Sequence, residues 1–233
     1  PSLNKAHEVV VPSEYLEKVF GDLGVTTRVV PNIINLDRFK PVDKDVQETS
    51  SQIFKLIITR NLEAIYGIET AIKALAKARQ HVPNICLAIA GTGPQREELE
   101  QLVRQLNLQD IVSFVGRLDA EQIVDFYQSA DVMLNPTTVD NMPNSVLESL
   151  ASGVPVVTTN VGGIPYIVKQ GETALLVDSG DAQAMADEIV CLYRESETRQ
   201  KLIENGLNAV QPYAWPQVKG QWLSLYNRVG AGT

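Results

Sequence analysis

The segment FKLIITRNLEAIYGIETAIKALAKARQHVPNICLAIA, residues 54–90, is the most informative part of the sequence about the fold. It opens and closes with apolar runs, 54–59 and 85–90, which lack a regular in–out alternation. Such runs predict strands covered on both faces of a sheet. Between them, from Gly67 to Arg79, apolar residues at helical spacing share one stripe: Ile68, Ala71, Ile72 and Leu75. A strand, a helix and a strand in this order predict a βαβ unit with parallel strands.

The same alternation continues through most of the chain. Further strands are expected at 7–11, 27–30, 111–115, 131–135, 155–159 and 174–177. Further helices are expected at 94–106, 120–129, 143–151, 182–194 and 196–208. Repeated βα units predict an α/β fold, a Rossmann-like doubly wound parallel sheet. Ligands of such sheets bind beyond the carboxyl ends of the strands, so the loops that follow strands are the candidate sites.

Charge and composition restrict the possible partners. The chain has 20 Lys and Arg residues and 28 Asp and Glu residues, which gives a net charge of −8. This acidic balance argues against nucleic acid or an anionic membrane as the general partner. A small phosphorylated ligand stays compatible, because one pocket can be locally positive. No apolar run approaches the roughly 20 residues of a membrane span. The two cysteines, Cys86 and Cys191, read as core thiols, and a cytoplasmic location is the simplest expectation.

The chain divides near residues 20–26. Residues before that point read as a strand and a helix capped by Ser13, and residues after it read as a nearly complete second unit. A last amphipathic helix is expected to begin near residue 214. Because the chain opens on Pro1 inside what reads as a folding unit, we expect a fragment of a longer protein.

Three loops after strands carry residues suited to binding. Arg60 follows the strand 54–59 and can present its guanidinium fork to phosphate, although it can also pair with Glu63. Gly91 and Gly93 allow a tight turn after the next strand, but no third glycine completes a dinucleotide motif. The segment Gly116-Arg117-Leu118 offers backbone groups to a flat base, or forms an ordinary turn before a helix capped by Asp119.

The fourth loop lies in VDNMPNSVLESLASGVPVV, residues 139–157, with Asp140 before a helix opened by Pro143. Asn144 and Glu148 share the polar side of that helix. Its amino end offers free N–H groups and partial positive charge to a phosphate. Glu148 lies roughly 7–8 Å along the helix axis at 1.5 Å per residue. This spacing suits a nucleotide-sugar, with the sugar near Asp140 and the ribose near Glu148, although an acid here also stabilises any helix.

At this loop the sequence resembles the carboxyl-terminal, donor-binding domain of family 4 glycosyltransferases, which have the GT-B fold. The motifs are VVPNIINLDRF, ITRNLEAIYGIETAIKAL, LAIAGTGPQREEL, VSFVGRLDAEQIVDFYQSADVMLNPT, DNMPNSVLESLASGVPVVTTNVGGIP and GETALLV, in family order. The resemblance implies that residues 1–25 are the last strand and helix of an amino-terminal acceptor domain. Residues 26–213 would form the donor-binding domain, and 214–233 the helix that crosses back.

The resemblance also implies an activity. Such enzymes transfer a hexose from a nucleoside-diphosphate sugar, commonly UDP- or GDP-linked, with retention and commonly without a metal or other cofactor. The acceptor would be a carbohydrate or a lipid-linked molecule in polysaccharide or glycolipid biosynthesis. It would bind to the missing acceptor domain, through which peripheral membrane contact can occur. A GT-B sugar-nucleotide epimerase and a non-catalytic nucleotide-sugar binding scaffold are the alternative interpretations.

Family roles map onto individual positions of this chain. Glu148 would bind the ribose hydroxyls, Asp140 the donor sugar, and Arg60 the diphosphate. The resemblance assigns the remaining donor contacts to Gly91, Gly93, Gly116, Arg117, Leu118, Asn141, Met142, Pro143 and Asn144.

Three positions depart from the family pattern. Tyr66 stands where a Lys usually supplies a second diphosphate cation, and we expect it to be the weaker partner. Asp140 is one methylene shorter than the usual Glu, and Tyr166 replaces a frequent Glu. The sequence Asp43-Lys44-Asp45 matches a DxD metal motif only formally, because it lies in a polar connector. We therefore expect no metal site.

Overall fold

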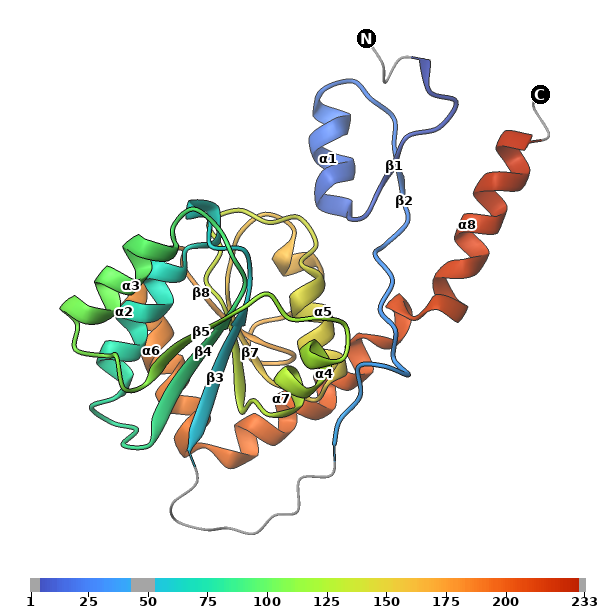
Figure 1. Ribbon diagram of the computed structural model, residues 1–233. Helices are drawn as coiled ribbons and strands as arrows, with labels where there is room; N and C mark the ends of the chain where they lie inside the picture. The colour runs from blue at the N-terminus through green and yellow to red at the C-terminus, as the bar shows by residue number, and fades with distance from the viewer. Residues whose placement is uncertain (1–4, 43–52, 231–233) are drawn as a thin grey trace.

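A computed structural model of the chain describes residues 5–42 and 53–230 (Figure 1). Its main sheet has six parallel strands in the order β5-β4-β3-β6-β7-β8. The strands are β3 (Phe54–Thr59), β4 (Ile85–Ala90), β5 (Val112–Gly116), β6 (Val132–Asn135), β7 (Val156–Thr159) and β8 (Leu175–Val177). The predicted doubly wound α/β fold is therefore confirmed.

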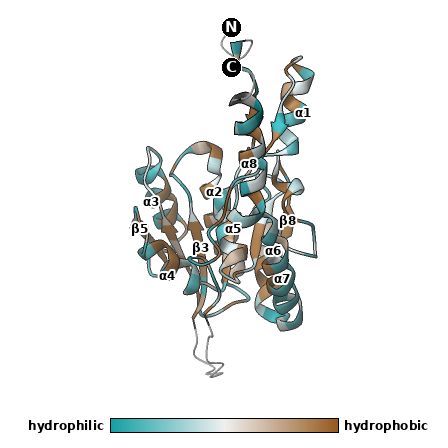
Figure 2. Cartoon of the chain, turned by 90° about the vertical axis from the view of Figure 1, so that its right-hand side faces the viewer, coloured by the Kyte–Doolittle hydropathy of each residue, from teal (hydrophilic) through white to brown (hydrophobic). Residues whose placement is uncertain are grey.

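Helices cover both faces of this sheet, as Figure 1 shows. They are α2 (Ile68–Ala78), α3 (Arg96–Gln105), α4 (Gln122–Gln128), α5 (Asn144–Ala151), α6 (Ala182–Arg194) and α7 (Ser196–Ala209). On β3, Leu56 and Ile58 join the core under α2, α3 and α6, whereas Ile57 joins the core under α4 and α5. All three side chains are fully buried, which explains the continuous apolar run. In Figure 2, strands of the sheet such as β3 have the brown colour of hydrophobic residues.

The order of the strands places the site. The chain runs outward from β3 to β4 and β5, and returns to pair β6 with the other side of β3. The strand order therefore reverses between β3 and β6, where the loops after the two strands diverge to opposite faces. Arg60 directly follows β3, and Asn135 is the last residue of β6.

The amino-terminal residues form a smaller unit with β1 (Val10–Val11), α1 (Glu14–Asp22) and β2 (Arg28–Val29). Strands β1 and β2 pair in parallel apart from the main sheet, and each is shorter than expected. The Ser13 hydroxyl accepts a hydrogen bond from the Leu16 amide at 3.2 Å and caps α1, as predicted. Helix α8 (Trp215–Gly230) extends toward this unit in Figure 1. The Arg228 Nη1 lies 4.0 Å from the Glu8 Oε1. The division at residues 25 and 213 stays a prediction.

Several boundaries differ from the sequence-based expectations. Helix α5 begins at Asn144, because the extended backbone of Pro143 makes that residue the N-cap rather than the first helical residue. Helix α3 begins two residues after Pro94, behind a short turn. Three 3-10 helices were not expected: Ala64–Tyr66, Ile164–Tyr166 and Gln211–Tyr213. The residues 43–45 of the formal DxD match lie outside the described residues.

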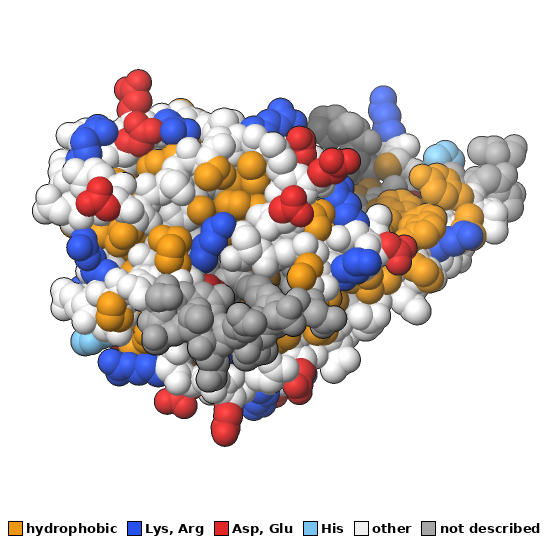
Figure 3. All heavy atoms as spheres, turned by 60° about the horizontal axis from the view of Figure 1, so that its bottom comes forward, with side chains coloured by type: hydrophobic (Ala, Val, Ile, Leu, Met, Phe, Trp, Pro, Cys, Tyr) orange, Lys and Arg blue, Asp and Glu red, His pale blue; other side chains and the backbone are white. Residues whose placement is uncertain are grey.

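Two expectations from composition can be compared with the structure. The expectation that Cys86 and Cys191 are core thiols is not met, because Cys86 in β4 and Cys191 in α6 are both only partly buried. Among the described helices, none is both long and apolar enough to cross a bilayer. On the face in Figure 3, acidic and basic side chains of the described residues are interspersed.

Candidate active site

Arg60 is the centre of the candidate site at the carboxyl ends of β3 and β6. Its Nε donates to the Asn135 Oδ1 at 3.0 Å, and its Nη2 lies 2.5 Å from the Asp140 Oδ2. The Arg60 and Asp140 side chains are each only 13% exposed. The sequence also allowed an ion pair between Arg60 and Glu63, but Glu63 instead accepts a 3.4 Å hydrogen bond from Asn61. The structure thus brings together two of the three predicted catalytic residues.

The loop from Asp140 to Pro143 packs on two glycines after β7. The Gly163 amide donates to the Asp140 carbonyl at 2.9 Å. A Cβ on Gly162 would lie 2.0 Å from that carbonyl oxygen, and one on Gly163 would lie 1.8 Å from the Asn141 carbonyl oxygen. Since no side chain fits such distances, glycine is required at both positions. The sequence analysis did not assign them a role, although the pair VGG after a strand was a usable signal.

Two polar side chains from the amino-terminal part hold the same loop. The Asn32 Nδ2 donates to the Met142 carbonyl at 3.1 Å and to the Asn144 Oδ1 at 2.9 Å. The Ser13 hydroxyl is hydrogen-bonded to the Asn141 side chain. Met142 was predicted to contribute its backbone amide, and its side chain is buried in the core. Sequence reasoning missed the contribution of Asn32, because its partners lie more than a hundred residues away.

Glu148, the third predicted catalytic residue, lies in the second turn of α5. Its Oε2 accepts a 2.9 Å hydrogen bond from the Tyr127 hydroxyl, which lies 2.7 Å from the Thr59 Oγ1. The opposite side of α5 is buried under the sheet, so the helix holds Glu148 at the margin of the core. Tyr127 is fully buried and was missed, because its surroundings in the sequence suggested only packing.

Burial also sets the protonation of this acid. Desolvation raises the pKa of the Glu148 carboxyl, while the hydrogen bond from Tyr127 and the charges of Arg38 and Arg60 oppose that rise. Burial, followed by the Glu148 charge, raises the pKa of the Tyr127 hydroxyl well above its usual range. Tyr127 therefore keeps its proton and acts as the donor to the carboxylate.

The predicted glycine loop lies against the loop of Arg60. Gly91 has a φ of 144°, and a Cβ there would lie 1.9 Å from the Arg60 carbonyl oxygen. A Cβ on Gly93 would lie 2.4 Å from the Leu62 carbonyl oxygen. The Gly91 amide donates to the Gly116 carbonyl at 2.8 Å, which links the loop to the end of β5. The close approach of these loops is itself enough to require both glycines.

The comparison with known proteins follows this geometry. Residues 40–209 match the family described as glycosyl transferases group 1. The chain belongs to this family. The match contains the three predicted catalytic residues, the two glycine loops and α5.

Individual relatives are similar over most of the chain. N-acetyl-alpha-D-glucosaminyl L-malate synthase of Bacillus anthracis is 25% identical over 225 residues, which are 96% of this chain and 56% of that protein. D-inositol 3-phosphate glycosyltransferase of Corynebacterium urealyticum is 31% identical over 172 residues, 71% of this chain and 41% of that protein. The chain therefore spans about half the length of these curated relatives.

A solved structure supports the same fold. Sucrose-phosphate synthase of Thermosynechococcus elongatus superposes with a TM-score of 0.89 at 29% identity, over 99% of this chain and 60% of that chain. The GT-B assignment of the fold is therefore confirmed, including the elements at both ends of the described chain.

Gly116 is the last residue of β5, the edge strand two positions from β3, and Arg117 and Leu118 follow it. Gly116 has a φ of 76°, which explains a glycine at this turn. The Asp119 side chain accepts from the amides of Glu121 and Gln122 at 2.9 Å in the turn before α4, but the N-cap of that helix is Glu121 rather than the predicted Asp119. The contact of this segment with a base stays a prediction.

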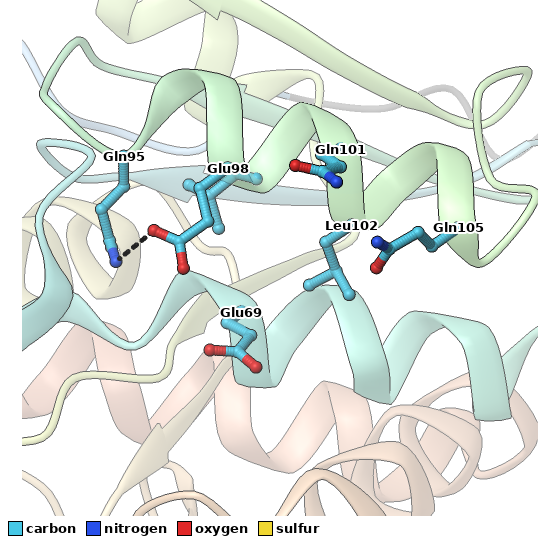
Figure 4. A pocket seen from close by; sticks show the side chains of 7 residues that line it. Glu69, Gln95, Glu98, Gln101, Leu102 and Gln105 are labelled. Carbon is cyan, nitrogen blue, oxygen red and sulfur yellow. Dashed lines mark hydrogen bonds between the residues drawn. The ribbon is translucent and has the colours of Figure 1, made fainter.

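A polar hollow of about 250 Å³ lies elsewhere, between α2 and α3 (Figure 4). Gln95 donates to Glu98 at 3.3 Å at one end of it. The hollow contains none of the predicted site residues: its lining is Glu69, Gln95, Glu98, Leu99, Gln101, Leu102 and Gln105. Within residues 5–42 and 53–230, no three His, Cys, Asp or Glu side chains gather as a metal site would require. The expectation of metal-independent chemistry remains a prediction.

Proposed function

We propose that this chain is the donor-binding half of a retaining hexosyltransferase that uses a UDP- or GDP-sugar. One observation carries the proposal: the Arg60 guanidinium meets Asp140 in the loop that leads into α5, and Glu148 lies one turn further along that helix. The amino end of α5 and the Arg60 guanidinium thus lie at the same loop, where both can bind the negative charge of a diphosphate. The membership of the family and its glycosyltransferase relatives support the same activity.

The residues divide the work of donor binding. Arg60 and the amides at the start of α5 hold the leaving diphosphate, whose charge grows as the sugar departs. The Glu148 carboxylate accepts hydrogen bonds from the ribose hydroxyls, and Asp140 lies on the side of the sugar. Because these groups already supply positive charge, the reaction proceeds without a metal or other cofactor.

Retention follows from attack on the face of the leaving group. The bond between the anomeric carbon and the phosphate oxygen breaks, and a bond from the acceptor oxygen forms on the same face. The acceptor proton moves to an oxygen of the departing diphosphate. The acceptor is a carbohydrate or a lipid-linked molecule, and it binds mainly to an amino-terminal domain beyond this chain. That domain also makes any peripheral membrane contact, and the protein acts in the cytoplasm. Residues 1–233 alone therefore bind nucleotide with little or no turnover.

A thermal-shift panel of UDP-, GDP- and ADP-sugars tests donor binding. A ligand at 100 times its Kd stabilises the folded chain by about 2.7 kcal/mol, which is readily measured. We expect a UDP- or GDP-sugar to stabilise the chain and Arg60→Ala to abolish most of the shift. The proposal is wrong if no nucleotide in the panel stabilises the wild-type chain. Product analysis with the full-length protein then separates transfer from epimerisation.

A further inference from the structure

Tyr66 stands where the resemblance places a Lys, and in the structure it lies beside Arg60. Its ring lies over the Arg60 guanidinium, with the Arg60 Cζ 5.1 Å from the ring centroid. The ring comes from the short 3-10 helix Ala64–Tyr66 and also packs on the apolar core. A partly desolvated aromatic ring at this distance attracts a guanidinium and restricts its plane.

The Arg60 guanidinium is consequently fixed from three directions. Asn135 and Asp140 accept hydrogen bonds along its edges, while Tyr66 lies over its face. The Asn135 Nδ2 itself donates to the Thr158 Oγ1 at 2.9 Å, and the Asp140 Oδ1 accepts from the Asn141 amide at 2.7 Å. Each polar group that holds Arg60 is therefore held in turn.

This arrangement leaves part of the guanidinium for a ligand. Arginine has five N–H donors in one plane. The hydrogen bonds to Asn135 and Asp140 use the Nε donor and one Nη2 donor, so these two residues leave one Nη2 donor and both Nη1 donors unused. With the plane fixed, those donors are oriented before any anion arrives, which lowers the ordering cost of binding.

We propose that Tyr66 is a positioning residue that fixes the Arg60 guanidinium for the diphosphate of the donor. This inference rests on the proposed function. The chain then compensates for a missing second cation by restricting the first, and the Tyr66 hydroxyl is not the group that acts on phosphate. Tyr66 acts through Arg60, so its effect is confined to ligands that carry the diphosphate.

Calorimetric titration of the chain tests this role. The ligands are UDP and uridine, or GDP and guanosine if the wild type prefers guanine. We expect Tyr66→Leu to weaken binding of the nucleoside diphosphate about tenfold and to leave nucleoside binding unchanged. Tyr66→Phe keeps the ring and should restore all but about twofold of that loss. In an Arg60→Ala background, Tyr66→Leu should weaken binding by less than a further twofold.

A matched control lies at the other end of β3. Tyr193 contacts Phe54 edge-on, with ring centroids 5.3 Å apart, so Tyr193→Leu makes the same change away from the site. We expect it to leave nucleotide affinity unchanged. If Tyr66→Leu does not fold, Tyr66→Met, with an unbranched apolar side chain, replaces it.

Four outcomes overturn the inference while leaving the proposed function intact. They are an unchanged affinity in Tyr66→Leu, an equal loss in Tyr66→Phe, an equal loss of nucleoside binding, and a full tenfold loss in the Arg60→Ala background. A wild-type chain that binds neither UDP nor GDP instead overturns the proposed function, and this inference with it.

Discussion

Asp140 and Glu148 lie eight positions apart, yet their environments differ. Asp140 lies in a loop and forms an ion pair with a guanidinium, and its second oxygen accepts from a backbone amide. Glu148 lies within a helix at the margin of the core, where a buried tyrosine hydroxyl is its donor. The loop acid is thus balanced by a full charge, whereas burial raises the pKa of the helix acid, and only a neutral donor and two more distant cations oppose that rise. Removing the partner of Asp140 should therefore lower the stability of the chain more than removing the partner of Glu148.

Arg60→Ala should have the largest effect. It removes the proposed diphosphate contact and leaves the Asp140 carboxylate nearly buried without its cation, so both binding and folding suffer. We expect nucleotide affinity to fall at least about 100-fold, and the free energy of unfolding to fall by about 3 kcal/mol. Calorimetry and urea titration measure these losses. Arg60→Ala combined with Asp140→Asn should regain part of the stability but none of the affinity, and an unstabilised double variant contradicts the ion-pair argument.

Glu148→Gln should have the second largest effect, and it should lower affinity without lowering stability. The amide still accepts from Tyr127, but it is a poorer acceptor for ribose hydroxyls than a carboxylate, which costs roughly 1.5–3 kcal/mol of binding. We expect a loss of about 10- to 100-fold in affinity with no loss of stability at pH 8, because burial already opposes the Glu148 charge. Glu188→Gln is the control, since Glu188 is also partly buried and lies in α6 away from the site. Equal losses in the two variants contradict the assignment.

Tyr127→Phe changes the environment of Glu148 while both acids stay in place. It removes the donor to Glu148 and should raise the pKa of that carboxyl further, because the hydrogen bond opposes the effect of burial. We expect about a fivefold loss of nucleotide affinity at pH 7, roughly 1 kcal/mol. The loss should shrink as the pH is raised, because a higher pH favours the ionised form of the Glu148 carboxyl. A loss that does not change with pH shows instead that Tyr127 serves only packing.

The smallest expected effect is the pH dependence of stability. The Glu148 pKa in the folded chain is raised above its ordinary value of 4.5, so the folded state binds this proton more tightly than the unfolded state. The cost of the buried charge is therefore present above the folded pKa and disappears as pH falls toward 4.5. The difference in unfolding free energy between Glu148→Gln and wild type should shrink over that fall in a series of urea titrations. A constant difference contradicts the raised pKa.

Local patterns predicted the framework and the main residues of the site. The strands at 54–59 and 85–90 and the helix at 182–194 agree with the structure at both ends. Arg60 was found because it directly follows a strand, and Glu148 because it lies on the polar side of a short helix. These inferences need only spacing within one or two elements.

Contacts between distant segments were beyond such patterns. The packing of Gly162 against the Asp140 backbone, and of Tyr66 against Arg60, depends on how two loops meet in space. Tyr127 lies in a run whose periodicity indicates core packing, and nothing local shows that its hydroxyl reaches Glu148. The resemblance supplied the proposed roles of the site residues, but the contact of Tyr66 with Arg60 is known only from the structure.

The hydrogen bonds from Asn32 to the Met142 carbonyl and the Asn144 side chain have a practical consequence for dissecting this protein. An expression boundary chosen from the family match, 40–209, would remove Asn32 and Ser13 and release the loop before α5 from both. Such a truncated product would keep the six-stranded sheet and could still give a well-behaved sample. Weak nucleotide binding by that product would then report on the cloning boundary rather than on the natural affinity.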